Sequence, residues 1–240
     1  MRIVISQSML FPWVGLLEQI RLADVFVHYD DVQFSKGSFV NRVQVKTAGG
    51  PRWMTVPLQA LRLGQRIDKV RIKPRQEWLG THLDLLKVSF RDAPFRDDAI
   101  EIAEKTYSME YSSIGDLSRA SMLALAKYFG LDATTRFLDV RQLNIPGSGS
   151  ERVLAVVKQL EGTHYVTGHG AARYLDHDAF EREHIHVEYV DYLRLPYPQP
   201  DGAFDPHVTG LDLVANCGRA GVRNICSNTK PWREFINESD

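Results

Sequence analysis

The amino-acid sequence predicts an α/β fold, a Rossmann-like parallel sheet flanked by helices, and two observations carry this prediction. An apolar run at 3–5, a helical stripe of Leu16, Leu17, Ile20 and Ala23, and the apolar segment "VFVHYDD" follow one another near the N-terminus. Strand, helix and strand in so short a space form a βαβ unit with parallel pairing. The same alternation returns after residue 130, in the strands "TTRFLDV", "HYVTGHG" and "HVEYVDY" and the helix "RVLAVVKQLEG".

Two further segments separate these α/β parts. Short alternating runs predict a β-rich excursion from 40 to 73, and longer helical patterns predict a helical insertion at about 76–129 that forms a cap. Its last helix has Asp116 as the expected N-cap and Gly130 at its end. Ser148 and Glu151 predict a capping box for the following helix. We expect one domain over 1–240, with a short helix in "GLDLVANCG" and a polar tail at about 219–240.

The composition indicates a folded protein that stays in the cytoplasm. Of the 240 residues 44% are hydrophobic, and 29 Lys and Arg against 30 Asp and Glu give a formal net charge of −1. Such a balance offers no electrostatic footprint for nucleic acid or for an anionic bilayer. The chain lacks a signal-peptide pattern and any apolar run of the roughly 20 residues that span a bilayer, so no membrane insertion is expected. Cys217 and Cys226 are expected to be reduced.

The stretch "VISQSMLFPWVG" is the first candidate site. It closes the first strand on polar residues and then places Pro12, Trp13 and Gly15 in a turn before the first helix. Helix N-termini bind anions, so Gln7 and the turn could hold a phosphate or a carbonyl oxygen. The alternative is structural: Pro12 starts the helix, while Phe11 and Trp13 fix it to the core. Neither GxGxxG nor GxxxxGK[ST] is present.

A dense polar segment after the second strand is the second candidate. Adjacent carboxylates repel, so Asp30 and Asp31 should point to opposite faces, and one of them could act as a general base or orient an amine. The side chains expected to bind substrate beside them are Gln33, Lys36, Asn41 and Arg42. We expect Arg42 and Lys36 to pair with phosphate. The alternative is a solvated loop.

The third candidate is "THYVTGHGAARYLD", where a strand closes on Gly168 and Gly170 with His169 between them and Tyr174 close behind. Because carboxyl ends of parallel strands meet at one edge of a sheet, we expect Gln7, the "DDVQF" segment and this turn to line one pocket. His184 and His186 share one strand face, but without a third ligand nearby they predict no metal site.

Taken together, "SQSMLFPWVG", "ADVFVHYDDVQFSKGSFVNRVQVKT", "WMTVPL", "GTHYVTGHGAARYLD" and "FDPHVTGLDLVANCG" resemble the WbqC-like family, in order and over residues 1 to about 218. The positions that fit its pattern are Gln7, Pro12, Trp13, Gly15, Asp24, Asp31, Gln33, Phe34, Asn41 and Arg42. Three positions depart: Ser6 stands where the family usually has histidine, Ser8 where it has proline, and Leu10 where it has an aromatic residue.

The resemblance implies a role in building or decorating the sugars of O-antigen or other surface polysaccharides. With the candidate residues, it leads us to expect a transferase acting on a nucleotide-linked amino sugar, with Asp31, Asp30 and His169 as catalytic candidates. Two alternatives stay open: a non-catalytic sugar-nucleotide binding module of the same pathway, and a class I-like nucleotidyl or adenylyl transferase. The expected partner is a small-molecule substrate, a nucleotide sugar, rather than nucleic acid. The sequence identifies no cofactor, and it leaves the oligomeric state open, a homo-oligomer included.

Overall fold

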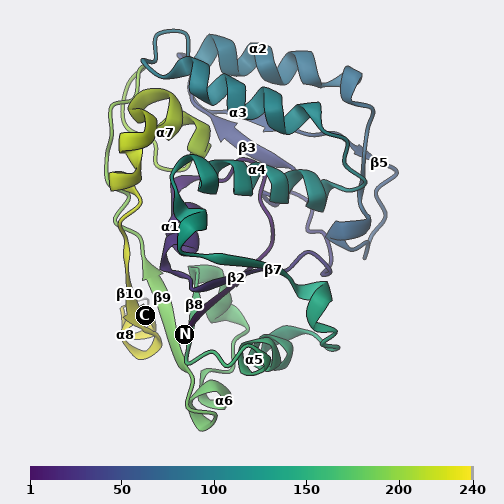
Figure 1. Ribbon diagram of the computed structural model, residues 1–240, viewed down its shortest axis with the longest axis vertical. Helices are drawn as coiled ribbons and strands as arrows, with labels where there is room; N and C mark the ends of the chain where they lie inside the picture. The colour runs from purple at the N-terminus through teal and green to yellow at the C-terminus, as the bar shows by residue number, and fades with distance from the viewer. Residues whose placement is uncertain (239–240) are drawn as a thin grey trace.

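The computed structural model describes residues 1–238, and a six-stranded sheet lies at its centre (Figure 1). Its strands are β1 (Arg2–Ser6), β2 (Val25–His28), β7 (Arg136–Asp139), β8 (His164–Thr167), β9 (His186–Asp191) and β10 (Asn228–Pro231). They lie in the order β10-β9-β8-β1-β2-β7, and only β10 runs antiparallel to its neighbour. The predicted α/β fold with parallel strands is confirmed.

The order of the strands fixes where a ligand can bind. The chain builds outward from β1 through β2 to β7, and then returns to the other side of β1 with β8 and β9. The direction of winding therefore reverses between β1 and β8. In doubly wound sheets the crevice for a ligand lies at such a reversal, outside the carboxyl ends of the strands.

Both faces of the sheet are apolar, because successive side chains of a strand point to opposite sides. In β1, Val4 packs into one hydrophobic cluster, while Ile3 and Ile5 pack into the other. In β2, Phe26 joins the cluster of Val4, and Val27 joins the opposite one. Burial on both faces explains why these strands are continuous apolar runs instead of alternating ones.

Helices cover both faces and make a layered molecule (Figure 1). The cluster that contains Val4 is closed by α1 (Val14–Leu22), α2 (Leu79–Ser89), α3 (Arg96–Ser108), α4 (Ile114–Tyr128) and α7 (Gly210–Cys217). The opposite cluster is closed by α5 (Gly149–Gln159), α6 (His177–Arg182) and α8 (Trp232–Asn237). In Figure 1, α2 and α3 stack outside α4, so the helical insertion forms an additional outer layer.

The β-rich excursion forms two small antiparallel ribbons apart from the central sheet. They are β3 (Arg42–Val45) with β4 (Arg52–Thr55), and β5 (Leu58–Gln59) with β6 (Arg71–Ile72). The excursion expected at 40–73 and the helices expected at about 76–129 are thus both present.

Some local expectations differ from the structure. The N-cap of α4 is Ser113, whose hydroxyl accepts a hydrogen bond from the Asp116 amide at 3.2 Å. Asp116 therefore sits inside the first turn, where a carboxylate favours the positive helix end, and was wrongly expected as the cap. Gly130 follows α4 with a φ of 73°, as a helix stop requires. Ser148 precedes α5, but its side chain makes no capping hydrogen bond.

The segment expected as a polar tail contains β10 and α8. The polar sequence of β10 contains no apolar run that would predict a strand, and α8, with six residues, is too short to show a helical period. Trp232 and Phe235 of α8 pack against the cluster of Val27, which gives the short helix its anchor.

Candidate functional site

A cavity of about 670 Å³ opens at the carboxyl ends of β1 and β8, where the winding of the sheet reverses. Its walls come from seven parts of the chain: the ends of β1 and β8 with the turns after them, the turns after β2 and β9, α1, the start of α5 and the segment before α7. The lining residues are Ile5, Ser6, Gln7, Met9, Trp13, Gln19, Tyr29, Val32, Gly149, Val153, Tyr165, Thr167, Gly168, His169, Gly170, Ala171, Tyr174, Tyr192, Arg194 and His207.

The turn after β1 is held rigidly by its neighbours. Phe11 is fully buried with a φ of 36°, and its amide donates to the Ser121 hydroxyl at 2.8 Å. Thr209 donates to the Phe11 carbonyl at 2.8 Å, and the Gly210 amide donates to the Pro12 carbonyl at 2.7 Å. These bonds come from α4 and from the start of α7, so the turn is an anchored wall of the cavity.

Trp13 lies across Gly15 and faces the cavity. A Cβ on Gly15 would come within 2.2 Å of the Trp13 ring, so glycine is required for the ring to lie there. The ring centroid is 5.1 Å from that of Tyr192 and 5.2 Å from that of His207. Phe11 anchors the turn in the core, as the structural interpretation expects, and Trp13 lines the cavity. Binding of a ligand by this turn stays a prediction.

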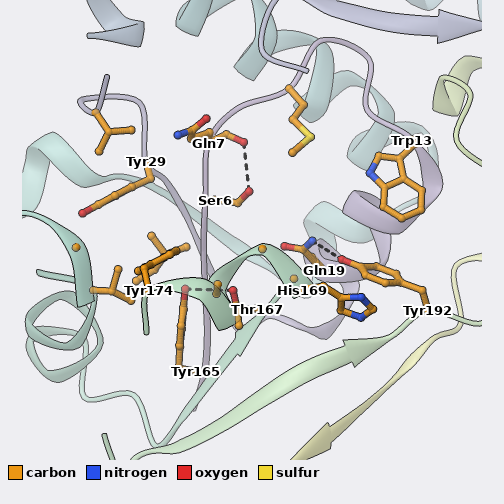
Figure 2. Close-up of a pocket in the computed structure, with 18 of the residues that line it drawn as sticks. Ser6, Gln7, Trp13, Gln19, Tyr29, Tyr165, Thr167, His169, Tyr174 and Tyr192 are labelled. Carbon is orange, nitrogen blue, oxygen red and sulfur yellow. Dashed lines mark hydrogen bonds between the residues drawn. The ribbon is translucent and has the colours of Figure 1, made fainter. Parts of the chain in front are cut away.

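Aromatic side chains stand on two sides of the cavity (Figure 2). Tyr29 and Tyr174 lie on one side, and Trp13, His169 and Tyr192 lie on the other, with Ser6 and Gln7 from the end of β1 between them. The arrangement presents two flat surfaces to a ligand.

The phenols of these walls are protonated at neutral pH. Burial raises the pKa of Tyr192 to about 12, and it also raises the pKa of Tyr29 and of Tyr174. Tyr192 accepts a hydrogen bond from the Gln19 amide at 2.7 Å, and a Cβ on Gly168 would lie 3.1 Å from both partners. Gly168 therefore allows the chain to pass close to this pair.

One ring nitrogen of His169 is hydrogen-bonded, and this bond determines which of the two nitrogens carries the hydrogen in the neutral ring. Nε2 lies 2.8 Å from the Val190 carbonyl oxygen, and since a carbonyl can only accept, Nε2 carries the hydrogen. In the neutral ring Nδ1 then has the free electron pair. The ring packs 5.0 Å from Tyr192 and 4.6 Å from Phe235. Nδ1 of His169 is therefore the ring nitrogen that is left as a hydrogen-bond acceptor.

The two adjacent carboxylates point to opposite sides, as predicted, and neither is among the lining residues. Asp30 pairs with Arg119 of α4 at 2.8 Å, on one side of the sheet. Asp31 accepts two hydrogen bonds from Arg152 of α5, at 2.8 and 2.6 Å, on the other side. The Arg152 guanidinium also lies 4.9 Å from the ring centroid of Tyr29, which lines the cavity. Asp31 therefore influences the cavity only indirectly, through Arg152 and Tyr29.

Asp30 is part of a buried network with Ser8 and His28. It accepts from the Ser8 amide at 2.8 Å and from the Ser8 hydroxyl at 2.7 Å, and the same hydroxyl lies 3.0 Å from His28 Nδ1. Burial raises the pKa of Asp30 and lowers the pKa of His28 to about 3. Proline has neither an amide hydrogen nor a hydroxyl, so a proline at position 8 could form neither bond to Asp30. The network therefore depends on Ser8, one of the residues that depart from the family pattern.

Arg42 does not reach the cavity. Its guanidinium donates twice to the Gly37 carbonyl, at 3.1 and 2.6 Å, and lies 4.1 Å from the ring centroid of Trp53. The Arg42 side chain thus closes the loop that precedes β3 and stacks on Trp53 of β4. It does not extend back over the "DDVQF" segment.

The other polar residues of this segment also lie outside the cavity. Gln33 and Lys36 are exposed, and Gln33 forms a backbone bridge with Arg66. Asn41 is buried and donates to the Val56 carbonyl at 3.0 Å, which ties β3 to the chain after β4. Of "DDVQF", only Val32 lines the cavity with Gln7 and the Gly168–Gly170 turn.

Several residues that line the cavity were not predicted from the sequence. Tyr29 and Tyr192 directly follow β2 and β9, the position that a parallel sheet marks for function. His207 lies in the "FDPHVTG" block, and the resemblance of this block to the family is a signal that could have identified it. Gln19 and Arg194 carried no signal, since a glutamine in a helix and an arginine in a loop are ordinary.

The remaining sequence expectations concern cysteines, metals and membranes. Both cysteines are free, and burial raises the pKa of the Cys217 thiol, which disfavours a nucleophilic thiolate. Within residues 1–238 no three His, Cys, Asp or Glu side chains gather as a metal site, and no helix is long and apolar enough to cross a membrane. His184 precedes β9, and the ring of His186 pairs instead with that of His164, 5.0 Å away.

Comparison with known proteins places the chain among relatives without an assigned activity. A family model described as the WbqC-like protein family matches residues 7–224. The chain is 31% identical over 220 residues to the uncharacterized protein Rv1507c of Mycobacterium tuberculosis, an alignment that covers 90% of this chain and 94% of that relative. No solved structure matches the chain significantly.

Proposed function

The chain belongs to the WbqC-like protein family, and we propose that it is a transferase acting on a nucleotide-linked amino sugar in the synthesis of O-antigen or another surface polysaccharide. The observation that carries the proposal is the cavity at the carboxyl ends of β1 and β8, with aromatic side chains on both sides. Its volume of about 670 Å³ lies within the range of small-molecule sites.

The two aromatic sides suit the two ring systems of a nucleotide sugar. A nucleobase stacks on flat aromatic side chains, and a pyranose packs its C–H face on them. In this proposal Trp13 and Tyr192 hold one ring, and Tyr29 and Tyr174 hold the other. The protonated tyrosine hydroxyls and the Gln7 amide supply hydrogen bonds at the centre.

The charge of the lining favours an anionic ligand. Among the described residues that line the cavity, Arg194 is the side chain with a permanent charge, and none is a carboxylate. A diphosphate placed between the two aromatic sides would meet Arg194 and the backbone amides of the Gly168–Gly170 turn, where glycine allows close approach. Arg194 takes the role that the sequence suggested for Arg42 and Lys36.

His169 is the general base in this proposal. The amino group of the sugar attacks the carbonyl carbon of an acyl thioester, and Nδ1 takes the proton that the nitrogen loses while Val190 holds Nε2 in place. The C–S bond of the tetrahedral intermediate then breaks, and the proton passes from Nδ1 to the leaving thiolate, so the products are the N-acyl sugar and a free thiol. Asp31 and Asp30 position the walls through Arg152 and Arg119 and do not touch the substrate.

A thermal-shift measurement with a UDP-linked amino sugar tests the binding. A ligand at 100 times its Kd adds about 2.7 kcal/mol, which raises the Tm of a domain of this size by about 5–10 °C. We expect Trp13→Ala and Arg194→Gln to abolish the shift. Trp53→Ala is the matched control, because this exposed tryptophan lies on β4 outside the cavity, and it should leave the shift intact. A shift unaffected by the two cavity variants would contradict the site.

Turnover separates the transferase from a second candidate, a sugar-nucleotide binding module. Two observations favour the module: Ser6 replaces the histidine usual in the family, and the cavity lining has no carboxylate. With a UDP-linked amino sugar and an acyl donor such as acetyl-coenzyme A, the transferase forms N-acyl product, and His169→Gln loses turnover while it keeps the thermal shift. A thermal shift without product for the wild type would select the module.

A further inference from the structure

The overall charge of −1 hides a strongly uneven distribution. Residues 36–75 contain ten Lys or Arg and one acidic residue, Asp68, so this segment has a formal charge of +9 and the rest of the chain −10. These residues build the two small ribbons and the loops between them. The total charge of −1 predicts no electrostatic footprint for an anionic surface, but the uneven distribution permits a local one at this segment.

The tip of the second ribbon presents apolar side chains to solvent. Residues 60–70 join β5 to β6, and their first part, 60–66, forms the tip loop, which lies beside β5 at the margin of the molecule in Figure 1. Leu63 is 99% exposed and Leu61 is 39% exposed. Exposed leucines are common on protein surfaces, and these two become informative through the basic side chains around them.

The tip loop is a turn that hydrogen bonds hold in place. Gly64 has a φ of +79°, and the Gln65 amide donates to the Arg62 carbonyl at 3.2 Å. The Gln65 side chain accepts from the Arg62 amide at 3.1 Å and donates to the Lys69 carbonyl at 2.6 Å. These bonds fix the turn that carries Leu63.

Basic side chains without acidic partners surround the tip loop. Arg62, Arg71 and Leu63 line one hollow of about 500 Å³ whose lining contains no carboxylate. Within the described residues, neither Arg62, Arg71 nor Lys69 pairs with an acidic side chain, whereas Arg66 of the same loop is neutralised by Asp68 at 2.8 Å. The tip therefore combines free positive charge with exposed leucines.

We propose that the tip loop docks the protein on an anionic lipid bilayer. Leu61 and Leu63 enter the boundary between headgroups and acyl chains, and Arg62, Arg71 and Lys69 meet the lipid phosphates. Aliphatic side chains at the tip favour a bilayer over single-stranded nucleic acid, which needs aromatic rings for stacking. The nearby exposed ring of Trp53 is already covered on one face by Arg42.

The docked surface is connected to the cavity. The amide of Ile67, one residue beyond the tip loop, donates to the carbonyl of Val32 at 2.9 Å, and Val32 lines the cavity. Docking through this surface holds the cavity wall close to the lipid headgroups. The proposal is independent of the ligand assigned to the cavity, because it rests on different residues.

Vesicle co-sedimentation of the full chain tests the proposal. We expect binding to vesicles of phosphatidylcholine with about one-third phosphatidylglycerol, little binding to phosphatidylcholine alone, and weakening as NaCl rises from about 0.05 to about 0.5 M. The double variant Arg62→Gln/Arg71→Gln should lower the partition coefficient about 25-fold, at about five-fold per charge. Leu61→Ser/Leu63→Ser should lower it at unchanged charge.

Matched controls lie elsewhere on the surface. Val88→Ser removes an apolar side chain that is 65% exposed on α2, and Arg223→Gln removes an exposed charge in the segment after α7. Both should bind as the wild type does. The proposal is overturned if the wild type ignores anionic vesicles, if the controls weaken binding as much as the tip variants do, or if the leucine pair has no effect. It is also overturned if a single-stranded oligonucleotide displaces the vesicles and binds through the same arginines.

Discussion

At the scale of single residues, Gly15 is the position where the smallest change has a defined effect. Gly15→Ala places a methyl group where the Trp13 ring now lies, at 2.2 Å, so the ring must move away from Tyr192 and His207. We expect the free energy of unfolding in urea to fall by about 1–3 kcal/mol, with a shift in tryptophan fluorescence.

Gly80→Ala is the control for this variant. Gly80 also lies in the first turn of a helix, α2, and a Cβ there would meet nothing within 4 Å. This substitution should stabilise the protein by up to about 1 kcal/mol. Equal stabilisation by both alanines would mean that Trp13 does not occupy the space over Gly15.

Two buried histidines make stability depend on pH. Burial, aided by the charge of Arg119, lowers the pKa of His28 from 6.5 to about 3, and burial lowers the pKa of His82 to about 4. Below pH 6.5 the unfolded chain therefore binds protons that the folded chain does not. Each histidine should cost about 1.4 kcal/mol of stability per pH unit as the pH falls from 6.5 toward its folded pKa.

Urea unfolding between pH 7.5 and 4.5 measures this dependence. His28→Gln should reduce the slope of stability against pH by about one proton, although it also removes the contact with Ser8 and lowers stability throughout. A slope that is the same in His28→Gln and the wild type would show that His28 is not the group that resists protonation.

Residue positions predicted the cavity better than residue types did. Gln7, Trp13, Gly168, His169, Gly170 and Tyr174 were expected at the site, and they line the cavity. Arg42 was expected there for its charge, but the sequence does not reveal the hydrogen bonds to Gly37 that turn its side chain away. A chain position fixes which strand a residue follows, whereas the direction of a long side chain depends on contacts that form only in the folded protein.

At the scale of elements, the pair of Arg152 and Asp31 joins α5 to the end of β2. Both side chains are nearly buried, and Arg152 also donates to the Ile145 carbonyl at 2.9 Å. Arg152→Met leaves the Asp31 carboxylate without its cation, so the free energy of unfolding should fall by about 3–5 kcal/mol.

The double variant Arg152→Met/Asp31→Asn tests the cause of that loss. Since the uncompensated charge is then removed, the double variant should be more stable than Arg152→Met alone, as measured by urea unfolding. If both unfold alike, the loss comes from packing of the arginine and not from the buried carboxylate.

Elements with a long apolar period were predictable, and short ones were not. The parallel βαβ unit and α5 are recognisable in the sequence because their apolar positions repeat. The strand β10 and the helix α8 were missed because their stability comes from β9 and from the cluster they cover, and neither partner is visible in their own sequence.

At the scale of the whole molecule, β10 and α8 close one margin of the central sheet. β10 pairs with β9 along four residues, and Phe235 stacks 4.2 Å from the Tyr189 ring and 4.6 Å from that of His169. Removal of residues 228–240 exposes the edge of β9, so we expect lower stability and increased self-association in size-exclusion chromatography.

Phe235→Ala serves as the control for the truncation. It removes the ring but leaves β10 in place, so it should lower the Tm without the increase in self-association. Equal self-association of the two variants would assign the effect to exposed apolar surface and not to the strand edge.

The central position of β1 also affects how the chain folds during synthesis. β1 pairs with β2, about twenty residues later in the chain, but its other edge pairs with β8, where Arg2 meets His164. At ribosomal rates of about 5–20 residues per second, β8 emerges about 8–30 seconds after β1. During that interval the nascent chain holds an apolar strand with one open edge, a state that chaperones bind and that delays completion of the binding crevice until most of the polypeptide has been made.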